Sequence, residues 1–250
     1  MKLITQKRKI HDIPVLEVVA EENRYEAIPL LVYYHGWQTG KELVLTQARK
    51  LAQAGFRVIA PDAMHHGERK TGPVSAVPGV TFLSSIHYNL LEFELLINFF
   101  QELHLVTDLY VGGVSMGGIT TCALLTQYPE IKAAASIMGS PQPTHYVQMI
   151  MTRARSFGGF IPRDYFASLQ WVTNVDLSLA PAKIAGRPLL FWHGRQDEKI
   201  PFVETASFYE SIRQEPYATK VEMIESNEGH LVKGETMDQI TAFFKKSLEK

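Results

Sequence analysis

The chain has 250 residues, enough for one large α/β domain or two small ones with a sizeable buried core. Apolar residues make up 46% of it, charged residues make up 20%, and the formal net charge is −1, as in an ordinary soluble globular protein. There is no basic excess to neutralise phosphates and no apolar run of the roughly 18 residues that a membrane span needs, so we expect neither nucleic-acid binding nor membrane insertion.

Two further features bear on the cellular compartment. Residues 1–9 carry charges along their length and no apolar core, which argues against a secretory signal. Cys122 is the single cysteine, so an internal disulfide is excluded and a reducing cytoplasm is favoured. We therefore predict a cytoplasmic protein in which Cys122 is a small buried hydrophobe rather than a reactive thiol.

The predicted elements alternate between strands and helices. Residues 3–10 and 13–20 are two short strands whose alternation favours an antiparallel pair at a sheet edge. Apolar runs of strand length and helices with one apolar face then follow in turn. They are a strand at 29–34, a helix at 41–54, a strand at 56–60, a helix at 82–105, a strand from 109 with a helix ending near 128, strands at 133–138 and 188–192, a helix at 203–214, a strand at 220–224 and a helix at 235–248.

This order predicts a doubly wound, mostly parallel sheet. Ser140 to Gly186 interrupts the alternation, because this stretch is too long for a βα loop and is rich in methionines and aromatic residues. We interpret it as a small, mainly helical cap over the C-terminal ends of the strands, and the alternative is a long surface crossover. The sequence thus predicts one α/β domain over residues 1–250 with a cap insertion at about 140–186.

The motif Gly113-x-Ser115-x-Gly117 stands where a strand-like run turns abruptly into a helix-like run. This is the pattern of a nucleophile elbow. Lifting the serine hydroxyl above the sheet requires a strained backbone, and the residues two before and two after pass so close that a Cβ on either would clash. The alternative is a glycine-rich strand end with an ordinary serine, so the rest of the chain has to decide.

A serine nucleophile needs a base, and the base needs an acid that holds its tautomer. In this type of fold the acid and then the histidine follow the serine along the chain, and catalytic groups lie just beyond the C-terminal ends of strands. Asp197 follows the strand at 188–192 and His230 follows the strand at 220–224. The other aspartates after Ser115 fall in the cap or on the last helix, which makes them poorer candidates.

At this point the chain resembles the α/β-hydrolases, and within them the prolyl-oligopeptidase-related serine esterases. The resemblance implies that Ser115 is the nucleophile, His230 the base and Asp197 its orienting acid, with the neighbouring Glu198 as an alternative acid. A serine at the elbow argues against dienelactone hydrolases, which use cysteine there, and dehalogenases, which use aspartate. The matching segments are His35-Gly36-Trp37, Pro61 to Arg69, the elbow, His193-Gly194-x-x-Asp197-x-x-x-Pro201 and Gly229-His230.

The oxyanion of the tetrahedral intermediate needs two donors. One is predicted to be the backbone N–H of Met116 at the N-terminus of the helix after the elbow. The resemblance implies that the other is the N–H of Trp37. For substrate binding we single out the side chains of Trp37, His145 and Trp171, although a surface position for His145 is an equal alternative.

Several polar residues have simpler interpretations. Asp62, His65 and His66 contain metal-ligand types, but no further ligands accompany them, so we expect hydrogen bonds that shape the active-site floor and neither a metal nor a cofactor. We expect His35 to hold the loop that supplies the oxyanion donor, and His193 to order its own turn.

The predicted function is hydrolysis of small-molecule carboxylic esters through an acyl-enzyme. A peptidase and a thioesterase on the same triad remain alternatives, although the chain has no room for the large N-terminal propeller with which oligopeptidases gate peptides. A catalytically inactive binding relative is a further alternative. Association of exposed cap surfaces into a homo-oligomer is left open as a hypothesis.

Overall fold

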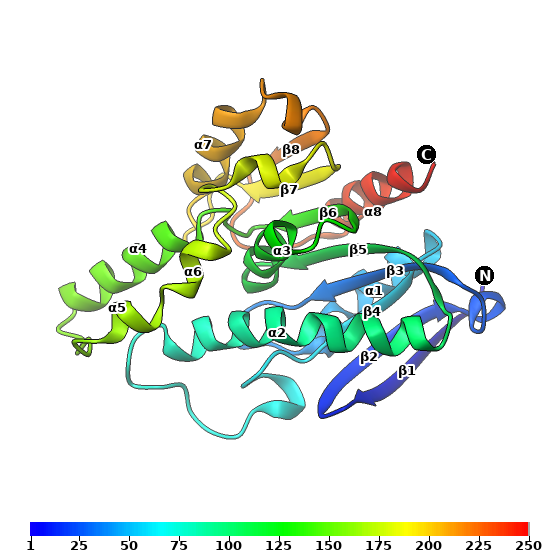
Figure 1. Ribbon diagram of the computed structural model, residues 1–250, viewed down its shortest axis with the longest axis horizontal. Helices are drawn as coiled ribbons and strands as arrows, with labels where there is room; N and C mark the ends of the chain where they lie inside the picture. The colour runs from blue at the N-terminus through cyan, green and yellow to red at the C-terminus, as the bar shows by residue number, and fades with distance from the viewer. Residues whose placement is uncertain (250) are drawn as a thin grey trace.

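The computed structural model describes residues 1–249, which form a single eight-stranded sheet with helices on both faces (Figure 1). The strand order is β1-β2-β4-β3-β5-β6-β7-β8. Neighbours are parallel from β4 to β8, as the alternating pattern predicts, and only β1–β2 and β2–β4 are antiparallel. The strands are β1 Leu3–Ile10, β2 Ile13–Ala20, β3 Ile28–Tyr34, β4 Arg57–Pro61, β5 Val106–Val114, β6 Ile131–Ile137, β7 Leu189–Gly194 and β8 Val221–Ser226.

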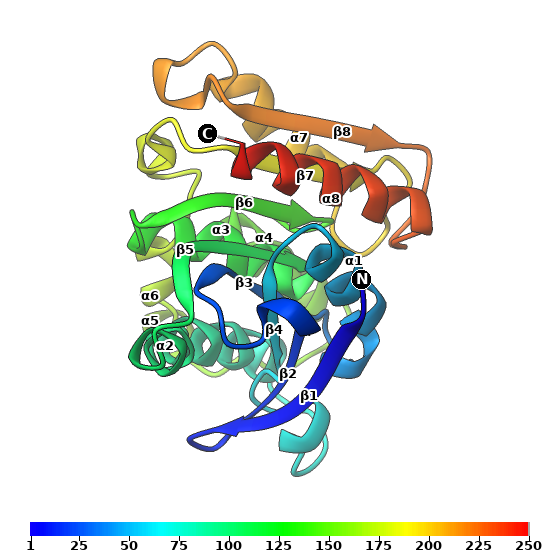
Figure 2. The ribbon, with the colours of Figure 1, turned by 90° about the vertical axis from the view of Figure 1, so that its right-hand side faces the viewer.

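The helices cover the two faces of the sheet because their apolar sides and the continuous apolar runs of the central strands exclude water together. One buried cluster joins the sheet to α1 and α8, and a second joins its other face to α2, α3 and α7 (Figure 2). Cys122 lies in the second cluster and is buried, as predicted. The helices are α1 Leu45–Gln53, α2 Val80–Glu102, α3 Met116–Gln127, α4 Pro143–Ser156, α5 Tyr165–Ser168, α6 Trp171–Asn174, α7 Phe202–Ile212 and α8 Gly234–Leu248.

The first helix starts later than the sequence predicts. Residues Lys41–Val44 form a 3-10 turn, and the α-helix begins only at Leu45. The cause is a buried anchor, because the Lys41 N–H and Nζ both donate to the carboxylate of Asp62, at 2.9 and 2.6 Å. This ion pair ties the start of the helix to the loop after β4.

Residues 140–186 contain the 14-residue helix α4 and the four-residue helices α5 and α6, which lie beside one end of the sheet in Figure 1. Their apolar side chains form a third cluster with the start of α2 and with Met116 and Ile119 of α3. The cap is therefore helical, as predicted, and it packs directly on the residue that follows Ser115. No helix within residues 1–249 is both long and apolar enough to cross a bilayer.

Candidate active site

Ser115 stands at the turn between β5 and α3 in a conformation that L-residues rarely adopt, with φ 58° and ψ −115°. The two motif glycines make this turn sterically feasible. A Cβ on Gly113 would lie 2.6 Å from the carbonyl carbon of Gly117, and one on Gly117 would lie 2.3 Å from the backbone oxygen of Tyr34. The sequence-based explanation of the motif is therefore confirmed by the packing around it.

The structure brings Ser115, His230 and Asp197 together from three segments of the chain. His230 follows β8, and its Nε2 lies 2.8 Å from the Oγ of Ser115. Its Nδ1 lies 2.7 Å from Oδ2 of Asp197, which follows β7. A carboxylate only accepts, so Nδ1 donates to Asp197 and Nε2 accepts the hydrogen bond from the Ser115 hydroxyl.

Asp197 is held ionised by its surroundings. Burial raises the pKa of this carboxyl, but hydrogen bonds from His193, His230 and the Ile200 N–H outweigh burial and hold the pKa well below the ordinary value. Its Oδ1 accepts the N–H groups of Lys199 and Ile200 at 2.9 and 3.0 Å. The carboxylate is thus held in position by contacts that do not involve His230.

His193 contributes more than the sequence predicts. Its fully buried ring lies with Nε2 at 3.3 Å from Oδ2 of Asp197 and at 2.9 Å from the carbonyl oxygen of Ile200. Both neighbours are acceptors, so Nε2 carries a proton. His193 therefore orders its turn and also supplies Asp197 with a second imidazole donor, whereas Glu198, the alternative acid, is exposed at the rim.

The two expected oxyanion donors are backbone groups beside Ser115. Within residues 1–249 neither the Met116 N–H nor the Trp37 N–H is paired with a protein acceptor, whereas the Ser115 N–H donates to Ile137 at 2.8 Å. A Cβ on Gly36 would lie 3.5 Å from the Cβ of Ser115, so the loop after β3 passes directly alongside the nucleophile. Both N–H groups are therefore free of protein acceptors on segments that lie beside the Ser115 side chain.

His35 holds this loop, as predicted. Its Nε2 accepts the Ala63 N–H at 3.0 Å, so its Nδ1 carries the proton and donates to the carbonyl oxygen of Gly36 at 2.8 Å. Burial lowers the pKa of His35 to about 4, which keeps the ring neutral at pH 7. The imidazole thus links the loop that carries Trp37 to the loop after β4.

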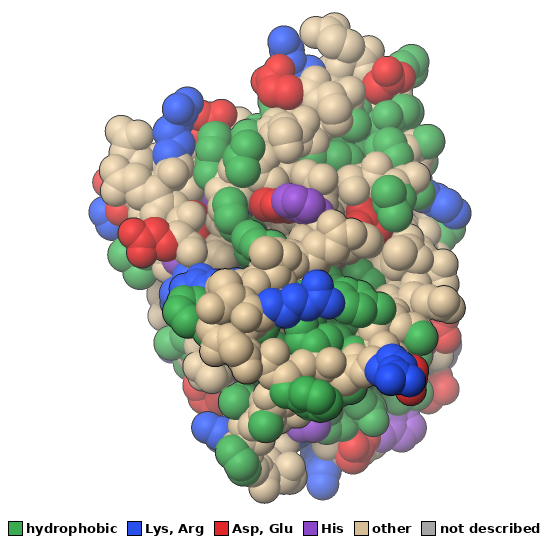
Figure 3. Space-filling view, turned by 90° about the vertical axis from the view of Figure 1, so that its left-hand side faces the viewer, with side chains coloured by type: hydrophobic (Ala, Val, Ile, Leu, Met, Phe, Trp, Pro, Cys, Tyr) green, Lys and Arg blue, Asp and Glu red, His purple; other side chains and the backbone are tan. Residues whose placement is uncertain are grey.

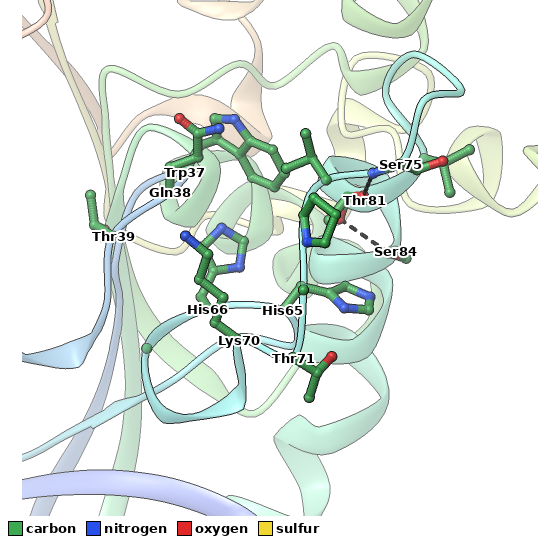
Figure 4. A pocket seen from close by; sticks show the side chains of 15 residues that line it. Trp37, Gln38, Thr39, His65, His66, Lys70, Thr71, Ser75, Thr81 and Ser84 are labelled. Atoms are coloured by element: carbon green, nitrogen blue, oxygen red, sulfur yellow. Dashed lines mark hydrogen bonds between the residues drawn. The ribbon is translucent and has the colours of Figure 1, made fainter.

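Three cavities meet at the side chain of Trp37. Cavity A, of about 550 Å³, and cavity B, of about 640 Å³, both reach Ser115, but only cavity A is lined by His230. Cavity C, of about 490 Å³, lies between the loop after β4 and the start of α2 (Figure 4). Figure 3 looks onto this end of the molecule, where hydrophobic side chains edge the hollows and basic side chains lie among them.

Two predicted substrate-binding residues are placed away from these cavities. Trp171 stacks on His87, with ring centroids 4.3 Å apart, and lines none of the three. The side chain of His145 is 61% exposed and binds Glu204 of α7. The adjacent Tyr146 and Ile150 line cavity B instead, and Trp37 lines it as expected. His145 and Tyr146 are neighbours on α4, and their residue types do not show which of the two is turned toward the cavity.

Asp62 and His66, two of the three residues that raised the question of a metal, form hydrogen bonds with protein groups. Both oxygens of Asp62 accept hydrogen bonds, from Lys41 and from the Glu68 N–H at 2.9 Å, and Nδ1 of His66 pairs with the Met64 carbonyl oxygen at 2.8 Å. Among residues 1–249 no three histidine, cysteine or acidic side chains are grouped to hold a metal ion. These contacts are the loop hydrogen bonds that the sequence predicts.

Comparison with known proteins identifies a fold family and two esterase relatives. Residues 29–211 match the model of the alpha/beta hydrolase fold family. The chain is 39% identical to "Putative esterase YitV" of Bacillus subtilis, over 83% of this chain and 84% of that protein. It is 29% identical to "Esterase YjfP" of Escherichia coli, over 97% of this chain and 98% of that protein.

A solved structure extends the comparison of the fold. The acylaminoacyl peptidase of Pyrococcus horikoshii superposes with a TM-score of 0.71 at 16% identity. The match covers all of this chain and 42% of that one, and at this identity it concerns the fold. The matched family model, the sheet order and the elbow agree, and the chain belongs to the α/β-hydrolase fold family.

Proposed function

We propose that this protein is a carboxylic ester hydrolase that works through an acyl-enzyme on Ser115. The observation that carries the proposal is the hydrogen-bonded chain from Ser115 Oγ to His230 Nε2, at 2.8 Å, and from His230 Nδ1 to Asp197, at 2.7 Å. Two backbone N–H groups beside the serine support it, as do the names of the two esterase relatives.

In the first half-reaction Ser115 Oγ attacks the ester carbonyl carbon while His230 Nε2 takes the hydroxyl proton. The carbonyl oxygen becomes an oxyanion that the N–H groups of Met116 and Trp37 stabilise, each worth roughly 3 kcal/mol by analogy with other oxyanion holes. When the tetrahedral intermediate collapses, the ester C–O bond breaks. His230 then returns the proton to the leaving alkoxide, which departs as an alcohol.

In the second half-reaction water replaces the alcohol. His230 takes a proton from water, hydroxide adds to the acyl carbon, and the same proton returns to Ser115 Oγ as the carboxylic acid leaves. Asp197 stays ionised throughout and stabilises the imidazolium that forms at each step. The free enzyme is restored with no net change in its protons.

The direction of proton transfer indicates which of the two cavities at Ser115 holds the alcohol part of the ester and which holds the acyl part. The leaving oxygen has to lie within hydrogen-bond reach of His230 Nε2, and His230 lines cavity A but not cavity B. The alcohol part therefore occupies cavity A, beside Leu43 and Leu231. The acyl part occupies cavity B, against Tyr146 and Ile150 of the cap helix α4.

The test is hydrolysis of p-nitrophenyl esters of increasing acyl length by the parent protein and by Ser115→Ala. We expect the substitution to lower kcat by at least about a thousandfold, since it removes the nucleophile. A fluorophosphonate probe should label the parent protein and leave Ser115→Ala unlabelled. Inactivity of the parent across acyl lengths, or equal activity of the variant, would overturn the proposal.

A further inference from the structure

Cavity C has a lining unlike those of the two cavities at Ser115. Its fifteen lining residues include five with hydroxyl groups, the amide of Gln38 and three nitrogen bases, and none of them is an aspartate or a glutamate. In Figure 4 the Lys70 side chain extends across the cavity toward His66 and Gln38. The bases are His65, His66 and Lys70.

The nearby carboxylates are directed away from this cavity. Asp62 and Glu68 both bind the buried Nζ of Lys41, at 2.6 and 2.7 Å, and this contact lowers the pKa of Glu68. The backbone of Gly67 packs so closely on Asp62 that a Cβ on Gly67 would lie 2.0 Å from the Oδ1 of Asp62. Within residues 1–249 no acidic side chain forms a salt bridge with Lys70, so its ammonium is a cation without a protein counter-ion.

Two hydroxyl groups that line cavity C can donate hydrogen bonds to a ligand. Thr81 Oγ1 accepts the Ser75 N–H at 2.8 Å, and Ser75 Oγ accepts the Val77 N–H at 3.1 Å. Because each oxygen already serves as an acceptor toward the backbone, each O–H hydrogen remains to be donated. An ammonium together with hydroxyl donors, with no carboxylate among the lining residues, is the arrangement that a carboxylate or phosphate requires.

The position of these donors connects cavity C with the acyl side of the active site. Ser75, Thr81 and Val74 line both cavity C and cavity B, whereas cavity A shares only residues 37–39 with it. A chain that starts at the carbonyl carbon next to Ser115 and follows cavity B past Trp37 therefore arrives at Ser75 and Thr81. The backbone of His65, at φ 67°, is held in the left-handed region at the floor of the same cavity.

We propose that cavity C binds an anionic oxygen group at the far end of the acyl chain, so that the preferred substrates are esters of acids that carry a second, ω-terminal carboxylate or equivalent anion. This inference rests on the ester hydrolysis proposed above and on the assignment of the acyl chain to cavity B. Lys70 supplies the charge, and Ser75 and Thr81 supply hydrogen bonds.

The experiment compares two series of methyl esters that differ only at the end of the acyl chain. Monomethyl esters of dicarboxylic acids from six to ten carbons are measured against methyl esters of the corresponding monocarboxylic acids, and the readout is the ratio of their kcat/KM values. Cavity B is itself lined by Arg153 and Lys199 as well as by Glu198, so a preference for the charged series does not by itself locate the anion, and the dependence of the ratio on Lys70 decides it. We expect a ratio above one at low ionic strength, with an optimum chain length, and a decrease as salt is added.

Lys70 variants identify the site. We expect Lys70→Gln to lower the ratio by about fivefold or more, and Lys70→Arg to retain most of it, as for a charge-assisted hydrogen bond at a partly exposed position. Lys9→Gln, which removes an exposed lysine of β1, is the matched control for the change in net charge. A ratio that falls equally in Lys9→Gln would overturn the assignment to cavity C.

A third ester tests whether the anion that cavity C binds is carried by the acyl part or by the alcohol part of the substrate. An acetate ester of an ω-hydroxy acid carries its carboxylate on the alcohol, and a Lys70-dependent preference for this ester alone would overturn the acyl assignment. A ratio below one throughout, or a ratio unaffected by Lys70→Gln, would overturn the whole inference. Hydrolysis of both series that survives Ser115→Ala would instead refute the proposed function, so the two failures are distinguishable.

Discussion

Replacing Gly117 by alanine tests the steric explanation of the elbow. The new Cβ would lie 2.3 Å from the backbone oxygen of Tyr34 and 2.7 Å from its carbonyl carbon. Ordinary contacts begin at 3.4 Å, so the end of β3 would have to move by about 1.1 Å (3.4 − 2.3). A backbone atom cannot rotate away as a side chain can, so we expect a cost at the upper end of the range for overpacking, about 3 kcal/mol.

The same movement should damage catalysis, because Tyr34 is followed directly by the loop that carries Trp37. A displacement of about 1 Å at an oxyanion donor can cost on the order of a hundredfold in rate. We therefore expect Gly117→Ala to lower kcat/KM for p-nitrophenyl acetate by about that factor. The melting temperature should fall by about 6–12 °C, at roughly 2–4 °C per kcal/mol for a chain of this size.

Urea denaturation followed by circular dichroism measures the stability, and initial rates measure the activity. Gly234→Ala is the matched control, because a Cβ at the start of α8 meets nothing within 4 Å and the backbone there is not left-handed. If Gly117→Ala unfolds at the same urea concentration as Gly234→Ala and hydrolyses the ester at the parent rate, the explanation of the motif is wrong.

Three further predictions concern stability and selectivity. Because the pKa of His35 is lowered from 6.5 to about 4, the unfolded chain binds a proton there that the folded chain does not. Protonation of His35 should therefore lower the free energy of unfolding by about 3 kcal/mol as the pH falls from 6.5 to 4. His35→Asn should remove this part of the pH dependence of stability, as measured by urea titration. Lys41→Met leaves Asp62 buried without its cation and should destabilise by about 3–5 kcal/mol. The double variant with Asp62→Leu should recover part of that loss in the same titration, and equal losses would contradict an ion-pair role. Ile150→Trp should lower kcat/KM for long acyl chains and Leu43→Trp for bulky alcohols, and the opposite pattern would reverse the cavity assignment.

The strand ends carry most of what the sequence could predict about the site. Asp197 and His230 each follow an apolar run, and parallel strands bring their carboxyl ends to one edge, so the alternation of strands and helices predicted that both lie near Ser115. The edge hairpin of β1 and β2 was likewise predicted within its observed bounds. These features depend on patterns that repeat along the chain, which is the information a single sequence provides most clearly.

Side-chain direction in the cap and the loops could not be predicted in the same way. Successive residues of a helix point about 100° apart, so His145 and its neighbour Tyr146 face different surroundings although either is a reasonable pocket residue by type. The second imidazole on Asp197 depends on how a turn folds, and His193 lies only four residues away. The ion pair of Lys41 and Asp62 joins segments 21 residues apart and has no periodic signature.

Trp37 combines two roles that are carried by different parts of one residue. Its backbone N–H is one of the two proposed oxyanion donors, while its indole edges all three cavities and contacts His66 and Phe82. Replacing the side chain of residue 37 can therefore change substrate choice while the backbone N–H is retained. Substitutions at residue 37 should change which esters are accepted over a wide range, while the transition state keeps the same two proposed backbone donors. A single substitution at this position is therefore a direct route by which a new substrate selectivity can evolve.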